Sequence, residues 1–341
     1  MSHLKHLLPV GKLPPEILAR LLSQAPVVHD RLLLGPGVGL DCAVVEFGSS
    51  LLVLKSDPIT FATEEIGWYA VQVNANDIAT TGAIPRWLLI TLLLPEGSTT
   101  AQLVDQISQQ VFSACREIGV TLVGGHTEIT VGLDRPIIMG TLIGEVDRQD
   151  LITPRGANPS DRILLTKGVP IEATAILARE FPHRLRQALS QEEIYQARAF
   201  LRDPGISVLR EARLAVQAGR VTAMHDPTEG GLASALWELA EASDRTLIVD
   251  LAVVPIPDLS ARICQLFGLD PFATIASGAL LLTVASPDAS PIKRALKSAG
   301  IPCAEIGEVQ AGPAEVWHRV QSGLEKLPRP IRDEITRVFE T

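Results

Sequence analysis

The first half of the chain alternates short aliphatic runs with longer amphipathic stretches, which predicts strands interspersed with helices. Glycines mark the expected boundaries. Gly48-Ser49-Ser50 separates two aliphatic runs as in a hairpin, and Gly82 and Gly119 stand where two helices would end. The elements expected here are a helix at 14–25, strands at 42–47 and 51–55, a helix at 65–81, a strand at 86–94, a helix at 99–118 that Thr99 or Thr100 can cap, and strands at 120–123 and 137–146.

A polar, turn-rich stretch at residues 153–160 interrupts this pattern and predicts a boundary between two domains, 1–152 and 153–341. The elements expected after it are strands at 162–166, 246–249, 279–284 and 303–309, and helices near 172–179, 191–201, 206–218, 229–242 and 290–298. We therefore predict an α/β (α+β) fold with an N-terminal α/β sheet domain and a C-terminal α/β domain with a mixed sheet. Ligand clefts commonly form between two such domains.

The composition excludes several functional classes. A net charge of −9, without any lysine or arginine cluster, argues against nucleic-acid binding. The longest apolar run, residues 87–94, is far shorter than the ~20 residues that span a bilayer, and lysines and prolines break up the first 15 residues, so no signal peptide is readable. The four cysteines are scattered singly, as is typical of packed thiols in a reducing compartment. We expect a cytoplasmic protein with neither a nucleic-acid nor a membrane partner.

Asp77 is the sharpest candidate for a functional residue. On the predicted helix it shares an apolar stripe with Ile66, Ala70 and Val73, so its carboxylate faces the expected core. A buried carboxylate must be hydrogen-bonded, paired or bound to metal. A structural aspartate that accepts bonds from a neighbouring turn is the alternative. We favour a metal ligand, because other aspartates occupy similar positions elsewhere in the chain.

Two of these aspartates lie near the hairpin. Asp57 follows the run at 51–55 and precedes Pro58, which favours an extended Asp57 whose side chain leaves the strand end. Taken alone, an Asx turn is the better explanation of Asp57. Lys55 points to the same side and can contact a phosphate. Asp41 follows a glycine-rich loop at 35–39 that can turn amide groups toward phosphate, although the loop matches neither a Walker A nor a dinucleotide-binding fingerprint.

Two further segments combine glycines with polar residues. Gly124-Gly125-His126-Thr127-Glu128 follows the strand expected at 120–123, at the end where ligands of open sheets collect. His225-Asp226-Pro227-Thr228-Glu229-Gly230-Gly231 precedes a helix whose free amide groups can bind an anion. In that second segment, capping of the helix by Thr228 or Asp226 is an equally good explanation, and the two are compatible.

Together these segments resemble the aminoimidazole ribonucleotide synthetase-like (PurM-like) ATP-binding superfamily. The residues that carry the resemblance are Gly39-Leu40-Asp41-Cys42-Ala43-Val44, Asn76-Asp77-Ile78-Ala79 with Gly82-Ala83-Ile84-Pro85, residues 124–128, and residues 225–232. Their order and spacing cover nearly the whole chain. Within the superfamily the sequence is most similar to the HypE hydrogenase maturation factors, and more distantly to thiamine-monophosphate kinase and selenophosphate synthetase.

The resemblance implies a homodimer that associates through the N-terminal sheets, with ATP in a cleft between the domains and Mg²⁺ between aspartates and phosphates. Carried onto this chain, the metal ligands are Asp41, Asp57, Asp77 and Asp226. The ATP-binding residues are Gly37, Gly39, Lys55, Asn76, Gly125, His126, Thr127 and Gly230, and the catalytic residues are His225, Asp226 and Glu229.

The sequence departs from HypE at three points. HypE ends in a tail whose terminal cysteine carries the group that is dehydrated, whereas the last cysteine here is Cys303. Glu229 stands where HypE has arginine, and His126 where relatives often have an acid. We therefore predict an ATP-dependent, Mg²⁺-requiring enzyme that phosphorylates a small-molecule or protein-borne acceptor and releases ADP. The alternatives are a thiamine-monophosphate kinase, a non-catalytic nucleotide-binding assembly protein and a metal-dependent phosphohydrolase.

Overall fold

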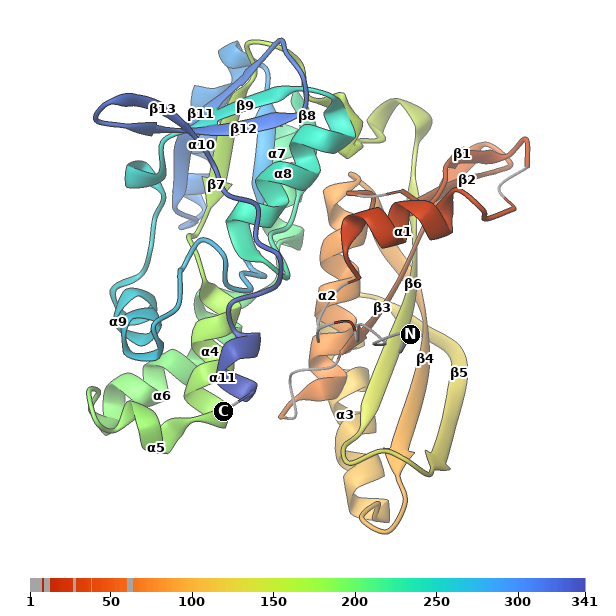
Figure 1. Ribbon diagram of the computed structural model, residues 1–341. Helices are drawn as coiled ribbons and strands as arrows, with labels where there is room; N and C mark the ends of the chain where they lie inside the picture. Colours follow the sequence, from red (N-terminus) through yellow and green to blue (C-terminus); the bar gives the residue numbers. More distant parts are fainter. Residues whose placement is uncertain (1–7, 9–12, 27–28, 38, 60–63, 341) are drawn as a thin grey trace, which may run out of the picture.

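The computed structural model describes residues 8, 13–26, 29–37, 39–59 and 64–340. Most of the first 15 residues, on which the signal-peptide prediction rests, and Val38 of the glycine-rich loop lie outside this part of the chain. The described residues form two mixed sheets, each accompanied by helices (Figure 1). This arrangement confirms the predicted two-domain α/β architecture, while the boundary at residue 152 stays a prediction.

Among the described residues, the first sheet has six strands, of which only β4 and β5 pair in parallel. Their spatial order is β1 (Leu32–Leu34), β2 (Ala43–Phe47), β3 (Ser50–Ile59), β6 (Ile137–Val146), β4 (Ile84–Pro95) and β5 (Thr121–Thr130). In the described ranges of this half, three helices accompany the sheet: α1 (Pro15–Leu22), α2 (Ile66–Thr80) and α3 (Ala101–Ile118).

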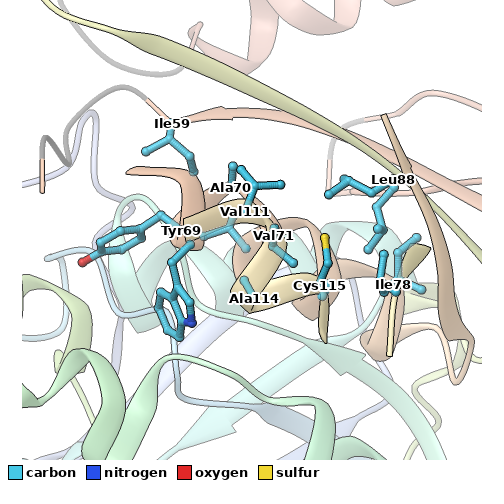
Figure 2. Close-up of a cluster of buried hydrophobic side chains, with 14 of the residues drawn as sticks. Ile59, Tyr69, Ala70, Val71, Ile78, Leu88, Val111, Ala114 and Cys115 are labelled. Atoms are coloured by element: carbon cyan, nitrogen blue, oxygen red, sulfur yellow. The ribbon is translucent and has the colours of Figure 1, made fainter. Parts of the chain in front are cut away.

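Helix α2 is the centre of the first domain, and every one of its 15 residues is buried. It packs against α3 through Val111, Ala114 and Cys115 (Figure 2). Gly67 permits the close approach, since a Cβ there would lie 2.5 Å from the Ile107 carbonyl oxygen. The other side of α2 faces the second domain, because Ile171 and Ala175 of that domain belong to the same buried cluster. A helix enclosed on all sides brings its polar residues into the interior.

The second sheet has seven strands, of which only β12 and β9 pair in parallel. Their order is β13 (Gly323–Lys326), β12 (Glu315–Val320), β9 (Thr246–Val249), β11 (Cys303–Gln310), β7 (Arg162–Thr166), β10 (Leu281–Val284) and β8 (Val221–His225). The accompanying helices are α4 (Ile171–Glu180), α5 (Pro182–Leu185), α6 (Gln191–Ala199), α7 (Leu209–Ala218), α8 (Gly231–Ser243), α9 (Asp258–Phe267), α10 (Ala289–Ser298) and α11 (Thr336–Phe339). None of the helices in the described ranges is both long and apolar enough to cross a membrane.

Two expected strand ends are wrong. Strand β3 continues through Asp57 to Ile59, paired with β6 along its length. Strand β2 pairs with β3 only as far as Leu54, so beyond it β3 has a strand on one side only, a position in which Pro58 is tolerated. Strand β5 continues to Thr130 and is an exposed edge strand, not a buried strand that ends at Val123. Strands β1, β8, β12 and β13 and helices α5, α9 and α11 were not predicted.

Candidate active-site cleft

A cleft of about 350 Å³ lies between the two domains and gathers many of the predicted site residues. The first domain contributes the loop before β2, strand β3 and helix α2. The second contributes the loop before α8, helix α8 and the C-terminal segment. The predicted site residues that line it are Gly37, Gly39, Asp41, Lys55, Asp57, Asp77, Glu229 and Gly230.

The charge centre of the cleft is the ammonium group of Lys55. Its Nζ lies 2.8 Å from Asp77, 3.2 Å from Asp57 and 3.8 Å from Asp41. Burial opposes the charge of Lys55, but the three carboxylates outweigh that effect, so the pKa of Lys55 is raised well above its usual value. The structure therefore brings three separated aspartates together around one permanent cation.

Two asparagines of α2 hold Asp77 at this position. The backbone N–H of Asp57 donates to Asn74 Oδ1 at 3.0 Å, which ties α2 to β3. Asn76 Nδ2 donates to the Ile206 carbonyl at 2.7 Å, and its Oδ1 accepts from the Val208 N–H at 2.9 Å. Both ends of the Asn76 amide are therefore used to join the domains. Asn76 does not line the cleft, and its predicted contact with ATP stays a prediction.

Asp41 is positioned from the second domain. Gly39 has a φ of +72°, and a Cβ there would lie 2.8 Å from the Glu238 carbonyl oxygen of α8, so only glycine allows this approach. His225 completes the arrangement, with Nδ1 3.1 Å from Asp41 and Nε2 2.7 Å from Glu238. Burial opposes a charged imidazole, but the two carboxylates prevail and the pKa of His225 is raised well above its usual value. His225 is thus held as a cation between two carboxylates, and its predicted catalytic role stays a prediction.

Asp226 follows His225 at the end of β8 and is the least compensated charge of the site. It is only 1% exposed, no N–H group in the described ranges donates to it, and its carboxyl group contacts that of Asp77 through a side-chain hydrogen bond. Burial raises the pKa of Asp226, and burial likewise raises the pKa of Asp77 against the opposing effect of Lys55. Ligand atoms of Asp41, His225 and Asp226 lie within 4.8 Å of one another. Carboxylate oxygens are the ligands that a hard divalent cation prefers, and Asp41, Asp77 and Asp226 supply them here.

The N-terminus of α8 differs from the prediction of a phosphate site. The backbone N–H of Gly230 donates to Asp333 Oδ2 at 2.5 Å, so a carboxylate of the chain itself occupies this donor. Gly230 is the N-cap, with a φ of +77°, and no side chain caps the helix. The predicted capping by Thr228 or Asp226 is therefore wrong, and the Gly230 N–H is already bonded to Asp333.

Gly125, His126 and Thr127 do not join the cleft. They lie within edge strand β5, where a Cβ at Gly125 would collide with the Ile90 carbonyl at 1.9 Å. His126 contacts Glu128 at 3.2 Å on the exposed face. Three strand spacings of about 4.8 Å separate β5 from β3, roughly 14 Å in all. Within one protomer these three residues therefore do not reach the cleft, and their contact with ATP stays a prediction.

Comparison with known proteins identifies the architecture. The N-terminal domain of AIR synthase related proteins matches residues 39–146, and their C-terminal domain matches residues 158–318. The chain belongs to the AIR synthase related protein family. This finding confirms the resemblance to the PurM-like superfamily inferred from the aspartate-containing segments.

The chain is also similar to individual proteins and solved structures. A carbamoyl dehydratase HypE of Cupriavidus necator is 34% identical over 261 residues, which cover 74% of this chain and 70% of that protein. A thiamine-monophosphate kinase of Escherichia coli K12 is 28% identical over 240 residues, covering 66% of this chain and 68% of the kinase. The crystal structure of hydrogenase maturation protein HypE in complex with ATP has a TM-score of 0.69 and 25% identity, with 92% of this chain and 90% of that chain covered.

Several residues of this family member's cleft were not predicted. Glu238 holds His225 from the middle of α8, where the sequence showed only an amphipathic helix. Arg329, Arg332 and Asp333 line the cleft from the C-terminal segment. No local signal marks either contribution, because proline and charged residues near a chain's end are equally typical of a solvated loop.

Proposed function

We propose that the protein is an ATP-dependent, Mg²⁺-requiring enzyme that transfers the γ-phosphoryl group of ATP to an acceptor and releases ADP. One observation carries the proposal: Asp226 is buried against the carboxyl group of Asp77, next to Asp41, and no N–H group in the described ranges donates to it. Carboxylates buried side by side are costly, and a bound divalent cation offsets that cost. The relatives described as a carbamoyl dehydratase, a kinase and an ATP complex support a nucleotide as the ligand of this cleft.

Asp41, Asp77 and Asp226 are the residues we assign to Mg²⁺, with Asp57 at the more exposed edge of the group. When bound, Mg²⁺ neutralises phosphate charge and helps to orient the transferred group. Lys55 neutralises the aspartates and stands where it can meet a phosphate oxygen. His225, held between Asp41 and Glu238, acts as a positioning residue that fixes the Asp41 carboxylate and joins the two domains at the cleft.

We also propose that the enzyme is a homodimer formed through β5. This edge strand exposes Leu122, Val123 and Ile129, with exposed fractions of 37%, 51% and 58%. An exposed apolar edge strand otherwise invites uncontrolled pairing with other chains. A second protomer would cover it, and any contact of Gly125, His126 or Thr127 with ATP requires such a second protomer.

Thiamine monophosphate is the second candidate acceptor, because the thiamine-monophosphate kinase of E. coli matches two thirds of the chain. If thiamine monophosphate is the acceptor, ADP forms only when thiamine monophosphate is added. A nucleotide-binding assembly protein without turnover predicts ATP binding and no ADP with any acceptor.

The proposal is tested by isothermal titration of the protein with ATP, with and without Mg²⁺. We expect binding that requires Mg²⁺ and that Asp226→Asn weakens by at least tenfold, since the variant keeps the shape and loses the charge. Asp105→Asn, at an exposed position on α3, is the matched control and should bind as the wild type does. Wild-type protein that binds no ATP at millimolar concentration would refute the proposal.

A further inference from the structure

The segment between β13 and α11, residues 327–335, forms a fixed wall of the cleft. Trp237 Nε1 donates to the Leu327 carbonyl at 3.0 Å at one end. At the other end Asp333 accepts from the Gly230 and Ile335 N–H groups at 2.5 and 2.8 Å, and Ile335 is completely buried. Figure 1 shows this segment descending beside α8 toward α4. Its position is therefore set by buried contacts at both ends.

Between these anchors the wall presents two arginines to the cleft. Arg329 and Arg332 both line it, and Lys55 is its other cationic lining residue. The ammonium of Lys55 is surrounded by three aspartates, so it is largely neutralised from within the protein. The loop opposite contributes Glu229, an anion. Among the described residues that line the cleft, Arg329 and Arg332 are therefore the cations that are not paired with the aspartate cluster.

We propose that Arg329 and Arg332 bind an anionic group of phosphate type in the cleft. The group is either the polyphosphate of the nucleotide or a phosphate on the acceptor, and this inference rests on the proposed function. A planar guanidinium with five N–H donors is suited to phosphate. In the first case the arginines strengthen nucleotide binding. In the second they select an acceptor that carries a phosphate.

The carboxylate partners of the two arginines are compatible with this role. Arg329 pairs with Glu241 through Nη1, and Arg332 pairs with Glu340 through Nη1 at 2.5 Å. All four side chains are between 28% and 45% exposed, and ion pairs at such positions contribute little. A guanidinium can therefore keep one carboxylate contact and offer its remaining edge to a phosphate, or exchange the weak contact for a group of higher charge.

The test is a set of titrations with three probes: Mg²⁺-ATP, inorganic phosphate in the presence of Mg²⁺-ADP, and inorganic pyrophosphate without nucleotide. The variants are Arg329→Ala, Arg332→Ala and the double variant. Arg337→Ala is the matched control, because Arg337 lies on α11, pairs with Glu334 and does not line this cleft. We expect the double variant to raise the Kd of at least one probe by about 10- to 100-fold, with the control unchanged.

The probes distinguish the two sources of phosphate. Weaker Mg²⁺-ATP and pyrophosphate binding assigns the arginines to the nucleotide, and weaker binding of inorganic phosphate alone assigns them to the acceptor. If all three probes bind the double variant within twofold of wild type, the inference is overturned. A wild type that binds pyrophosphate but no ATP refutes the proposed function instead.

A further variant tests Arg329 without replacing it, so the result does not depend on whether the arginine variants fold. Glu241→Gln removes the competing carboxylate and leaves Arg329 in place. Anion binding by Arg329 predicts a Kd for the same probe that falls several-fold in this variant. If the Arg329–Glu241 pair is purely structural, the Kd of that probe in Glu241→Gln is unchanged, and Arg329 does not bind the anion.

Discussion

The Lys55 ammonium lies 2.8 Å from the Asp77 carboxylate, and their side chains are only 9% and 3% exposed. The two residues come from different layers of the first domain, Lys55 from strand β3 and Asp77 from helix α2. Their pairing is thus a contact between sheet and helix as well as the electrostatic centre of the cleft. Removing one partner of such a pair leaves an uncompensated buried charge, which costs far more than the pair itself contributes.

Replacement of Lys55 by methionine tests this relationship. Lys55→Met keeps the length of the side chain but leaves Asp77 and Asp226 without the ammonium, so we expect the metal-free protein to lose about 3–5 kcal/mol of unfolding free energy. Mg²⁺ should restore part of this loss, since a bound cation replaces the missing charge. Urea unfolding with and without Mg²⁺ measures both effects.

The control is Lys326→Met, which breaks an exposed pair with Glu315 on the second sheet. It should change the unfolding free energy by less than about 1 kcal/mol and show no dependence on Mg²⁺. Equal losses of unfolding free energy in the two variants would mean that the Lys55–Asp77 pair contributes no more to stability than an exposed pair.

Local sequence patterns predicted most of the helices and the central strands, because glycine stops and apolar periodicity act within a few residues. These patterns did not predict where some strands end or which strands lie at the edges of the sheets. Gly124 and Gly125 weaken a strand locally, yet pairing with β4 carries β5 on to Thr130. Which strand lies at an edge depends on the order of strands in space, and β5 follows β4 by a parallel crossover that no local pattern reveals.

The candidate site shows the same division between local and long-range information. A buried aspartate on an apolar helix face was enough to identify Asp77, because the cost of burying a charge is independent of the rest of the fold. Its companion Asn76 is equally buried, but its partners are the backbones of Ile206 and Val208, about 130 residues away. The role of Asn76 could not be read from the sequence, since the same amide suits a nucleotide or a peptide group.

Replacement of Asn76 by alanine separates these two roles. Asn76→Ala leaves the buried Ile206 carbonyl and Val208 N–H without partners, so we expect a loss of about 3 kcal/mol in unfolding free energy. The Kd for Mg²⁺-ATP at a temperature where the variant is folded should stay within twofold of wild type. Asn158→Ala, which removes an exposed bond to the Gly156 carbonyl, is the control for stability. A tenfold weaker Kd with normal stability would return Asn76 to the nucleotide site.

Glu172 gives the protein a specific dependence of stability on pH. Burial raises the pKa of this α4 carboxyl to about 7, against the lowering effect of its hydrogen bond with Ser277. Because the folded pKa lies above the unfolded value of 4.5, the folded state holds the proton more tightly, and stability falls as pH rises from about 4.5 to about 7. The fall attributable to Glu172 is on the order of 3 kcal/mol.

Glu172→Gln should remove this part of the pH dependence. We expect the unfolding free energy of the variant, relative to wild type, to increase between pH 5 and pH 8 in urea titrations. Some dependence should remain, since burial also raises the pKa of Asp333 to about 6. Glu325→Gln, at an exposed position on β13, should follow the wild type at every pH. A parallel pH course in wild type and Glu172→Gln would contradict the assignment.

The exposed edge of β5 predicts the state of assembly. Val123 and Ile129 project apolar surface from an edge strand, and a lysine at such a position is an effective block to pairing between edges. We expect the wild-type protein to sediment as a dimer and the Val123→Lys, Ile129→Lys double variant to sediment as a monomer that keeps its helical circular dichroism. Phe47→Lys is the matched control, because Phe47 is 64% exposed on β2, near the opposite edge of the same sheet. If the dimer is lost with Phe47→Lys and kept with the β5 variant, the contact between protomers lies at the other edge of the sheet, and Gly125, His126 and Thr127 have no route to a nucleotide.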